Sequence, residues 1–286
     1  MKKLSRHFFA ALLLVGSTSN YALTTTQPVD FNADTAGQYN TDEFKKDWLT
    51  GMYSSEKGNL YIANATDASN NVAKRNKKRR AATSDDKWFE VVYPKGQVGG
   101  SAGVAFPAPL QGDYDKLFFQ YEVMFPADFS PPEKGGGKLP GLASDEDESG
   151  CVSNVSGFSS RYMWRYDTLD LKLYLYYPGK TENCGDYVEL DTPYRFTPGQ
   201  WTTLTQEVKL NTIGKKDGYI HVWVNGVPYL DLQNLELRTD ANLHISYAQI
   251  DAFPGGSDTS QWAFTSDQRN YFDNFTVSLD KPALLD

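Results

Sequence analysis

The sequence predicts an all-β fold, either a sandwich or a barrel. Among its 286 residues, Tyr and Phe are abundant, with 18 and 16 copies. Short apolar runs are interrupted by Gly and Pro, of which there are 23 and 14. No long stretch carries apolar residues at helical spacing, and together these features are typical of many short strands joined by turns. We expect few and short helices.

The first 22 residues have the layout of a secretory signal peptide. A basic start is followed by an apolar run from Phe8 to Val15 and then by small polar residues. The run is too short to span a bilayer, and no later segment has the roughly 20 apolar residues of a transmembrane helix. We therefore expect a secreted or periplasmic protein whose mature part, residues 23–286, forms a single β domain.

The net charge of −8 constrains the partners of the protein. An acidic chain is a poor ligand for nucleic acid, and it would repel other polyanions unless positive charge is concentrated at the binding face. We expect no nucleic-acid partner, no membrane partner and a monomer.

The two cysteines, Cys151 and Cys184, are more often bridged than free in an exported chain. Because no His pair accompanies them, we expect no zinc site and no cofactor.

One short helix is expected from Thr41 to Leu49, where Thr41 can cap the first turn and Phe44 and Trp48 share a face.

Two charged runs, residues 74–80 (KRNKKRR) and 145–148 (DEDE), are expected to be solvated loops. The basic run could alternatively make a secondary contact with an anionic polymer. The acidic run lacks the alternating ligands and the Gly of an EF-hand loop.

Three predicted strands have side chains that sort by parity, because alternate residues of a strand point to opposite faces. Each strand has one apolar face, which we assign to the core. These apolar sets are Phe158, Tyr162, Trp164 and Tyr166 in the first strand, Leu171, Leu173 and Leu175 in the second, and Ile220, Val222 and Val224 in the third. The third strand ends in Asn225-Gly226, a strong hairpin signal.

The opposite faces of these strands are rich in basic and aromatic side chains. If the three strands belong to one sheet, its open face carries Arg161, Arg165, Lys172, Tyr174, Tyr176, His221 and Trp223. Guanidinium groups pair with carboxylates, Trp rings stack on sugar rings, and phenols exchange protons, so such a face suits an acidic sugar chain. The alternative is an ordinary solvated face of an antiparallel sheet.

Several blocks of the sequence resemble the alginate and glucuronan lyases of polysaccharide lyase family 14. The resemblance covers roughly Trp88 to Ser278, and its specificity comes from the order and spacing of the blocks rather than from any single one. The blocks are GGGKLPGL from Gly135, FSSRYMWRY, LKLYLYYP, RFTPGQWTTLTQEVKLN, DGYIHVWVNGVPYLD, FPGGSD and YFDNFTVS. After KLPGL the chain continues Ala143-Ser144, where family members often have an aromatic residue and glycines, and this departure leaves the substrate preference open.

The resemblance implies a β-jelly-roll of two antiparallel sheets and a set of site residues. The family's functional lysine matches Lys138, its Ser-x-Arg pair matches Ser159 and Arg161, and its Tyr-x-Tyr pair matches Tyr174 and Tyr176. We expect Lys138 to lie in a Gly-rich loop that folds over the sheet. The implied activity is cleavage of a polyuronate, alginate first and glucuronan next, by β-elimination.

Elimination at a uronate needs a neutralised C6 carboxylate, a base for the C5 proton and an acid for the departing O4. Arg161 is the expected neutraliser, because its charge is permanent and its fork matches a carboxylate. Lys138 either shares that role or acts as base. Tyr176 is the expected proton shuttle, provided that nearby positive charge lowers its pKa, with Tyr174 and Ser159 positioning the substrate. A base with a pKa near neutrality could also be His221.

Further contacts to the substrate are expected from Arg165, Lys172, His221 and Trp223 on the same face. The candidate disulfide between Cys151 and Cys184 would join the loop before the Arg161 strand to the loop after the Tyr176 strand. A binding module or lectin is the main alternative function, since it needs aromatic stacking but no such set of proton-transfer groups. A glycoside hydrolase would need two flanking carboxylates, and Glu189 with Asp191 is an isolated match.

Overall fold

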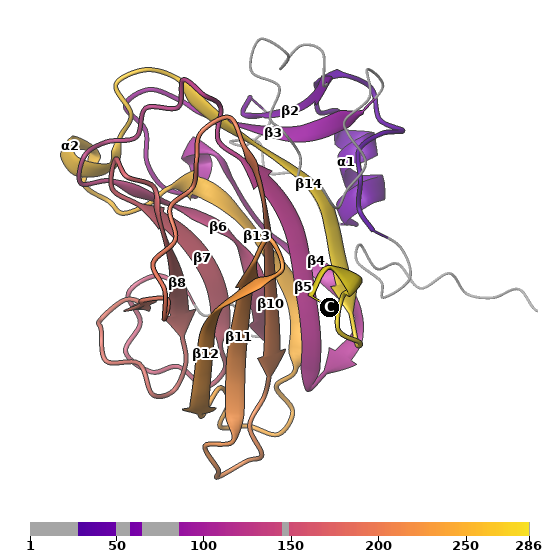
Figure 1. Ribbon diagram of the computed structural model, residues 1–286, viewed down its shortest axis with the longest axis vertical. Helices are drawn as coiled ribbons and strands as arrows, with labels where there is room; N and C mark the ends of the chain where they lie inside the picture. Colours follow the sequence, from indigo (N-terminus) through magenta and orange to yellow (C-terminus); the bar gives the residue numbers. More distant parts are fainter. Residues whose placement is uncertain (1–27, 50–57, 65–85, 145–148, 286) are drawn as a thin grey trace, which may run out of the picture.

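The protein is a sandwich of two antiparallel β-sheets, which confirms the predicted all-β class. The computed structural model describes residues 28–49, 58–64, 86–144 and 149–285. One sheet has eight strands in the order β1-β2-β3-β14-β5-β10-β11-β12, and the other has six in the order β4-β13-β6-β7-β8-β9 (Figure 1). Two short helices, α1 and α2, lie outside the sheets.

The eight-stranded sheet is built from β1 (Gly37–Gln38), β2 (Leu60–Asn64), β3 (Lys87–Tyr93), β5 (Lys116–Met124), β10 (Trp201–Lys209), β11 (Gly218–Val224), β12 (Val227–Leu235) and β14 (Gln268–Ser278). The six-stranded sheet is built from β4 (Val104–Tyr114), β6 (Gly136–Ser144), β7 (Ser159–Arg165), β8 (Asp170–Tyr176), β9 (Asp186–Val188) and β13 (Ile245–Pro254). The helices are α1 (Thr41–Trp48) and α2 (Thr259–Trp262).

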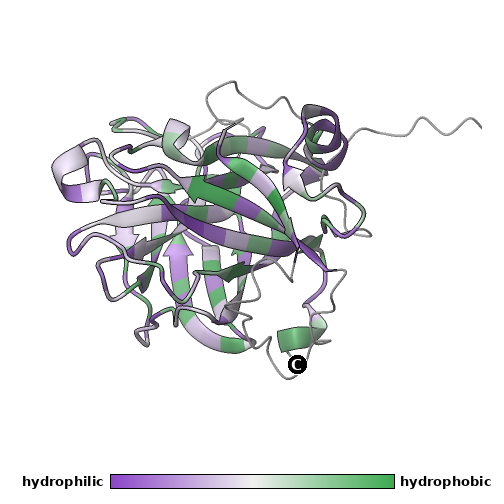
Figure 2. Cartoon of the chain, turned by 90° about the horizontal axis from the view of Figure 1, so that it is seen from above, coloured by the Kyte–Doolittle hydropathy of each residue, from purple (hydrophilic) through white to green (hydrophobic). Residues whose placement is uncertain are grey.

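The core lies between the two sheets and is filled from alternate positions of the strands. Apolar and polar residues alternate along several strands in Figure 2, as expected for strands with one buried face. The predicted apolar sets of β7, β8 and β11 all lie in this core, with one exception. Tyr166 follows the end of β7, has a left-handed φ of 65° and is 41% exposed, because the chain turns there toward β8.

The helix predicted between Thr41 and Leu49 is present as α1, but a different residue caps it. The side chain of Asn40, rather than that of Thr41, accepts hydrogen bonds from the backbone N–H groups of the second and third following residues. Phe44 and Trp48 are both fully buried in the core, as their spacing predicts. Leu49 ends the helix with a left-handed φ of 51°.

The predicted hairpin is also confirmed. Asn225 and Gly226 connect β11 to β12, and both have positive φ values, 52° and 82°, as a two-residue type I′ turn requires. The Asn225 side chain accepts a hydrogen bond of 2.9 Å from the N–H of Thr203 on β10, which ties the turn to the next strand.

The expectation that the three predicted strands share one sheet is wrong. β7 and β8 are neighbours in the six-stranded sheet, whereas β11 pairs with β10 and β12 in the other sheet. Parity assigned the faces of each strand correctly but contains no information on which strands pair. His221 and Trp223 therefore lie on the outer face of the eight-stranded sheet, away from Arg161.

Three sequence features fall outside the described residues: the signal-peptide segment, the basic run 74–80 and the acidic run 145–148. In the described part of the chain, no helix has both the length and the apolar character needed to cross a membrane.

Candidate functional site

Lys138 is a strand residue, which corrects the prediction of a Gly-rich loop. It lies in β6, in register with Met163 of β7 on one side and with Phe253 of β13 on the other. The glycines of this strand serve close packing rather than a loop, because a Cβ on Gly137 would stand 2.5 Å from Trp164 Nε1. On Gly141, a Cβ would approach a backbone oxygen of β7 to 1.9 Å.

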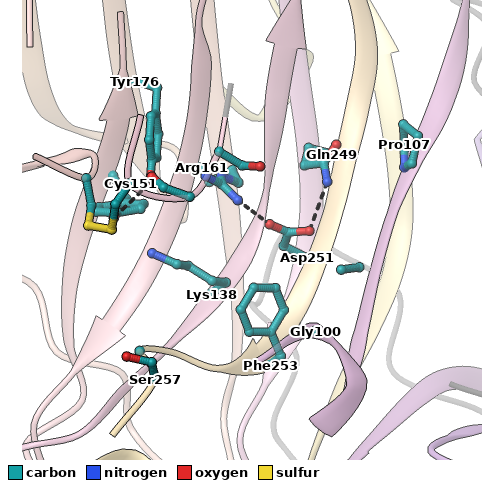
Figure 3. A pocket seen from close by; sticks show the side chains of 16 residues that line it. Gly100, Pro107, Lys138, Cys151, Arg161, Tyr176, Gln249, Asp251, Phe253 and Ser257 are labelled. Atoms are coloured by element: carbon teal, nitrogen blue, oxygen red, sulfur yellow. Dashed lines mark hydrogen bonds and ion pairs between the residues drawn. A yellow bond between two sulfur atoms is a disulfide. The ribbon is translucent and has the colours of Figure 1, made fainter. Parts of the chain in front are cut away.

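A pocket of about 500 Å³ opens on the face of the six-stranded sheet that points away from the core. Register places its polar groups together, since Arg161 pairs with Tyr174 across β7 and β8. Lys138 joins them from β6 (Figure 3). The side chains that converge there are Lys138, Arg161, Tyr174, Tyr176, Gln249 and Asp251.

Gln249 and Asp251 of β13 are pocket residues that the sequence reasoning missed. Arg161 Nη1 donates to Asp251 Oδ2 at 2.5 Å, and Gln249 Nε2 donates to Asp251 Oδ1 at 3.0 Å. Arg161 is 3% exposed and Asp251 1% exposed, so this is a buried ion pair. The signal was present, because Ala248, Ile250 and Ala252 alternate with these polar residues and lie in the core.

Lys138 is held as an amine that loses its proton readily. Burial is the largest cause that lowers its pKa well below the ordinary value, and Arg161 adds to it, while Asp251 acts in the opposite direction. Its Nζ lies 3.0 Å from the centroid of the Tyr174 ring and 3.0 Å from the sulfur of Met163. A neutral amine in this position can accept a proton from a bound molecule.

Tyr174 and Tyr176 form a hydrogen-bonded pair, with 3.2 Å between their hydroxyl oxygens. The Tyr176 hydroxyl donates to the Gly150 carbonyl at 2.6 Å, and the Gly185 N–H donates to the Tyr174 oxygen at 3.0 Å. Burial raises the pKa of Tyr174 far above its ordinary value, and the lowering effect of Arg161 is smaller. For Tyr174, the expectation that positive charge would make a phenol of this face more acidic is therefore wrong.

Three other predicted residues share this face of the sheet but do not line the pocket. Ser159 is fully buried in register with Tyr176. Lys172 forms an ion pair with Glu189. Arg165 lies at the end of β7, where its guanidinium packs against the rings of Tyr166, Tyr187 and Trp262, at 5.0, 5.1 and 4.5 Å from their centroids.

His221 and Trp223 lie on the other sheet and have other partners. His221 Nδ1 is 3.1 Å from a carboxylate oxygen of Glu207, and Nε2 is 3.0 Å from one of Asp231. The Trp223 ring packs against Phe118, with 6.2 Å between centroids. The structure therefore removes His221 as a rival base and Trp223 as a stacking platform for a substrate in this pocket.

The predicted disulfide between Cys151 and Cys184 is present. It joins the loop between β6 and β7 to the loop between β8 and β9, and both cysteines line the pocket. Among the described residues, no group of three or more His, Cys, Asp and Glu side chains is placed to hold a metal ion.

Comparison with known proteins assigns a family model to most of this chain. The model of polysaccharide lyase 14 matches residues 81–275. Among curated protein sequences, none matches the chain at a significant level.

Solved structures provide several neighbours of the same fold. The alginate lyase Aly36B is 20% identical, with a TM-score of 0.70 over 88% of this chain and 95% of that one. A marine PL-14 alginate lyase from Aplysia kurodai is 23% identical, with a TM-score of 0.67 over 88% and 98%. The alginate lyase vAL-1 from Chlorella virus is 20% identical, with a TM-score of 0.53 over 78% and 93%. Double-alanine variants of Aly36B have been solved with an alginate trisaccharide and with an alginate tetrasaccharide.

Proposed function

The chain belongs to the polysaccharide lyase 14 family, and from this premise we propose that it cleaves a polyuronate by β-elimination. Alginate is the proposed first substrate and glucuronan the next. The observation that carries the proposal is a buried amine, Lys138, in one pocket with a guanidinium and two hydrogen-bonded phenols. These are the group types that an elimination requires, and a module that only binds sugar does not need them.

The proposed reaction begins with the C6 carboxylate of a uronate bound at Arg161. Its negative charge must be balanced before the C5 proton becomes acidic. Arg161 already pairs with Asp251, so the combined positive charge of Arg161 and Arg165 provides the balance. The substrate carboxylate then shares the guanidinium rather than displacing Asp251.

Lys138 is the proposed base and Tyr176 the proposed acid. The neutral amine removes the C5 proton, and the electrons of that bond form the C4=C5 double bond as the C4–O4 bond breaks. The departing O4 takes the hydroxyl proton of Tyr176. The cycle ends when the ammonium of Lys138 returns a proton to the phenolate, so no external acid or base is consumed. The burial that lowers the pKa of Lys138 supports this division of roles.

The carboxylates of the site support elimination over hydrolysis. Of the described residues that line the pocket, Asp251 is the one carboxylate, and it is committed to Arg161. A hydrolase of the common type needs a pair of carboxyl groups on either side of the scissile bond. Glu189 and Asp191 do not supply it, since Glu189 pairs with Lys172 and Asp191 accepts a backbone hydrogen bond from β12.

We also propose that the protein is exported and acts as a monomer. The first 22 residues support export, and a disulfide at the site fits an oxidising compartment. Recovery of the protein from a periplasmic or culture fraction, with its mass reduced by that segment, tests the proposal.

The experiment that tests the activity is incubation with mannuronate-rich alginate, guluronate-rich alginate and glucuronan. Formation of the unsaturated product is followed by ultraviolet absorbance, and product masses are read by mass spectrometry. Lys138→Ala and Tyr176→Phe should abolish product formation, while Lys134→Ala and Tyr219→Phe, which alter exposed or distant side chains, should not. Binding without a new double bond would support the binding-module alternative, and normal activity in either site variant would remove that residue from the mechanism.

A further inference from the structure

The hydroxyl groups of Tyr174 and Tyr176 both end on backbone groups next to the disulfide. Tyr176 contacts the carbonyl of Gly150, whose neighbour is Cys151. Tyr174 contacts the N–H of Gly185, whose neighbour is Cys184. The four groups form one chain of hydrogen bonds that begins at one half of the disulfide and ends at the other.

The two backbone groups at the ends of this series fix the direction of every hydrogen bond in it. A backbone N–H only donates, so the Tyr174 oxygen accepts from Gly185. A backbone carbonyl only accepts, so Tyr176 gives its single hydroxyl proton to Gly150. The remaining contact, of 3.2 Å, must therefore have Tyr174 as donor and the Tyr176 oxygen as acceptor. We call this sequence from Gly185 to Gly150 the tyrosine relay.

The tyrosine relay fixes the Tyr176 oxygen between a donor, the Tyr174 hydroxyl, and an acceptor, the Gly150 carbonyl. When Tyr176 has given up its proton, the Tyr174 hydroxyl still donates to its oxygen, and the Gly185 N–H in turn supports Tyr174. Hydrogen bonds to an ionised oxygen are about twice as strong as those to a neutral one. The bond to the Gly150 carbonyl, in contrast, needs the hydroxyl proton in place, so the relay sets where the Tyr176 hydroxyl lies and from where its proton is transferred.

The disulfide holds the two ends of the relay at a fixed separation. Its cysteines have Cα atoms 4.1 Å apart, although they belong to loops separated by 33 positions in sequence. Gly185 also fits closely against the phenols, since a Cβ there would stand 2.6 Å from Tyr176 Cε2 and 2.9 Å from Tyr174 Cζ. The covalent link joins the two loops directly, in addition to the hydrogen bond that each loop makes with the tyrosine pair.

We propose that the Cys151–Cys184 disulfide is a positioning element of the reaction, which sets the tyrosine relay and thereby the proton transfer from Tyr176. This inference rests on the proposed lyase function. Its consequence is an activity that depends on the redox state of this disulfide, since Cys151 is exposed and Cys184 is partly exposed to a reductant.

The first test compares oxidised and reduced wild-type protein on the polyuronate that it cleaves, alginate first. On reduction with dithiothreitol, we expect kcat to fall about tenfold to a hundredfold while KM changes less than about twofold, because proton transfer rather than binding is impaired. Reoxidation should restore kcat. A Cys151→Ser, Cys184→Ser double variant should have the kcat of reduced protein and be insensitive to dithiothreitol, with circular dichroism confirming its fold.

A second variant keeps the test decisive if the double variant does not fold. Gly185→Ala retains the disulfide but places a methyl group against both phenol rings, so it should lower kcat at least as much as reduction does. Unchanged kcat in reduced wild type, or in folded Gly185→Ala, would overturn the inference. If oxidised wild type cleaves neither alginate nor glucuronan, both proposals fall. If oxidised wild type is active but loss of the disulfide leaves kcat unchanged, the proposed function is retained and the inference about the disulfide is wrong.

Discussion

Arg161 and Asp251 form their buried ion pair across a third strand, β6, which lies between β7 and β13. Gly141 of β6 is in register with Arg161 on one side and with Gln249 on the other. Because Gly141 has no side chain, β6 can lie close to β7 here, where a Cβ would stand 1.9 Å from the Ser160 carbonyl oxygen. The same strand carries Lys138, so one short segment supplies the amine and also packs closely against the strand of Arg161.

Asp251→Asn should shift the pH dependence of the reaction toward lower pH. The Asp251 carboxylate raises the pKa of Lys138, against the lowering by burial and by Arg161. Its removal lets the amine lose its proton at lower pH, so the rising limb of the kcat profile moves in the acid direction if Lys138 is the base. Asp128→Asn, which changes an exposed carboxylate that does not line the pocket, is the control. If the rising limb of the kcat profile keeps its position in the folded variant, Lys138 is not the group whose loss of a proton produces that limb.

Arg165→Ala should weaken binding of long substrates more than of short ones. Arg165 is four residues beyond Arg161 on the same face of β7, which corresponds to about 13 Å along the strand. With the exposed ring of Tyr187, it offers a charged and aromatic surface outside the pocket. We expect KM for polymer to rise about tenfold and KM for short oligomers to change little. Arg269→Ala, on the other sheet, serves as control, and equal effects on all chain lengths would contradict this placement.

His221→Ala and Trp223→Ala should leave kcat and KM within about twofold of wild type, because both residues are on the outer face of the opposite sheet. Some loss of thermal stability is expected for Trp223→Ala, since its ring packs on Phe118. Steady-state kinetics below the melting temperature separates the two effects. A large rise in KM for either variant would mean that substrate also contacts the eight-stranded sheet.

Asp34→Asn should stabilise the protein at neutral pH. Burial, and then the Asp47 carboxylate, raise the pKa of Asp34 from 3.8 to about 6. The native state therefore holds the proton more tightly than the unfolded state, and stability falls as pH rises from about 4 through 6. At 1.36 kcal/mol per pKa unit, the penalty above pH 6 is at most about 3 kcal/mol. Thermal unfolding should show a higher Tm for the variant at pH 7 and none of that gain near pH 4, whereas a constant difference across pH would contradict the assignment.

Strand parity predicted much of the site, because the alternation of a strand is a local property. Arg161, Tyr174 and Tyr176 lie on one surface as their spacing requires, and the two cysteines form the expected bridge. The pairing of strands is not local, which is why His221 on β11 was placed beside residues of another sheet.

Burial and close packing account for the remaining differences. The glycines around Lys138 suggested a loop, but they are the residues that allow β6 to approach its neighbours closely. Asp251 is the single acidic residue of β13, and its importance depends on an arginine that lies 90 positions away in sequence. For Tyr174, desolvation raises the pKa more than the nearby positive charge lowers it. This balance depends on how deeply the phenol is buried, which the sequence does not give.

The edge strands of the two sheets disfavour strand pairing between copies of this protein. An open edge is a template for a strand of a second chain unless it is short, bulged or interrupted by proline. Here β1 and β9 have only two and three residues, β4 contains Pro107 and Pro109, and β12 contains Pro228 with two register shifts against β11. All four described edges thus resist sheet extension, which favours separate molecules even when the protein is concentrated.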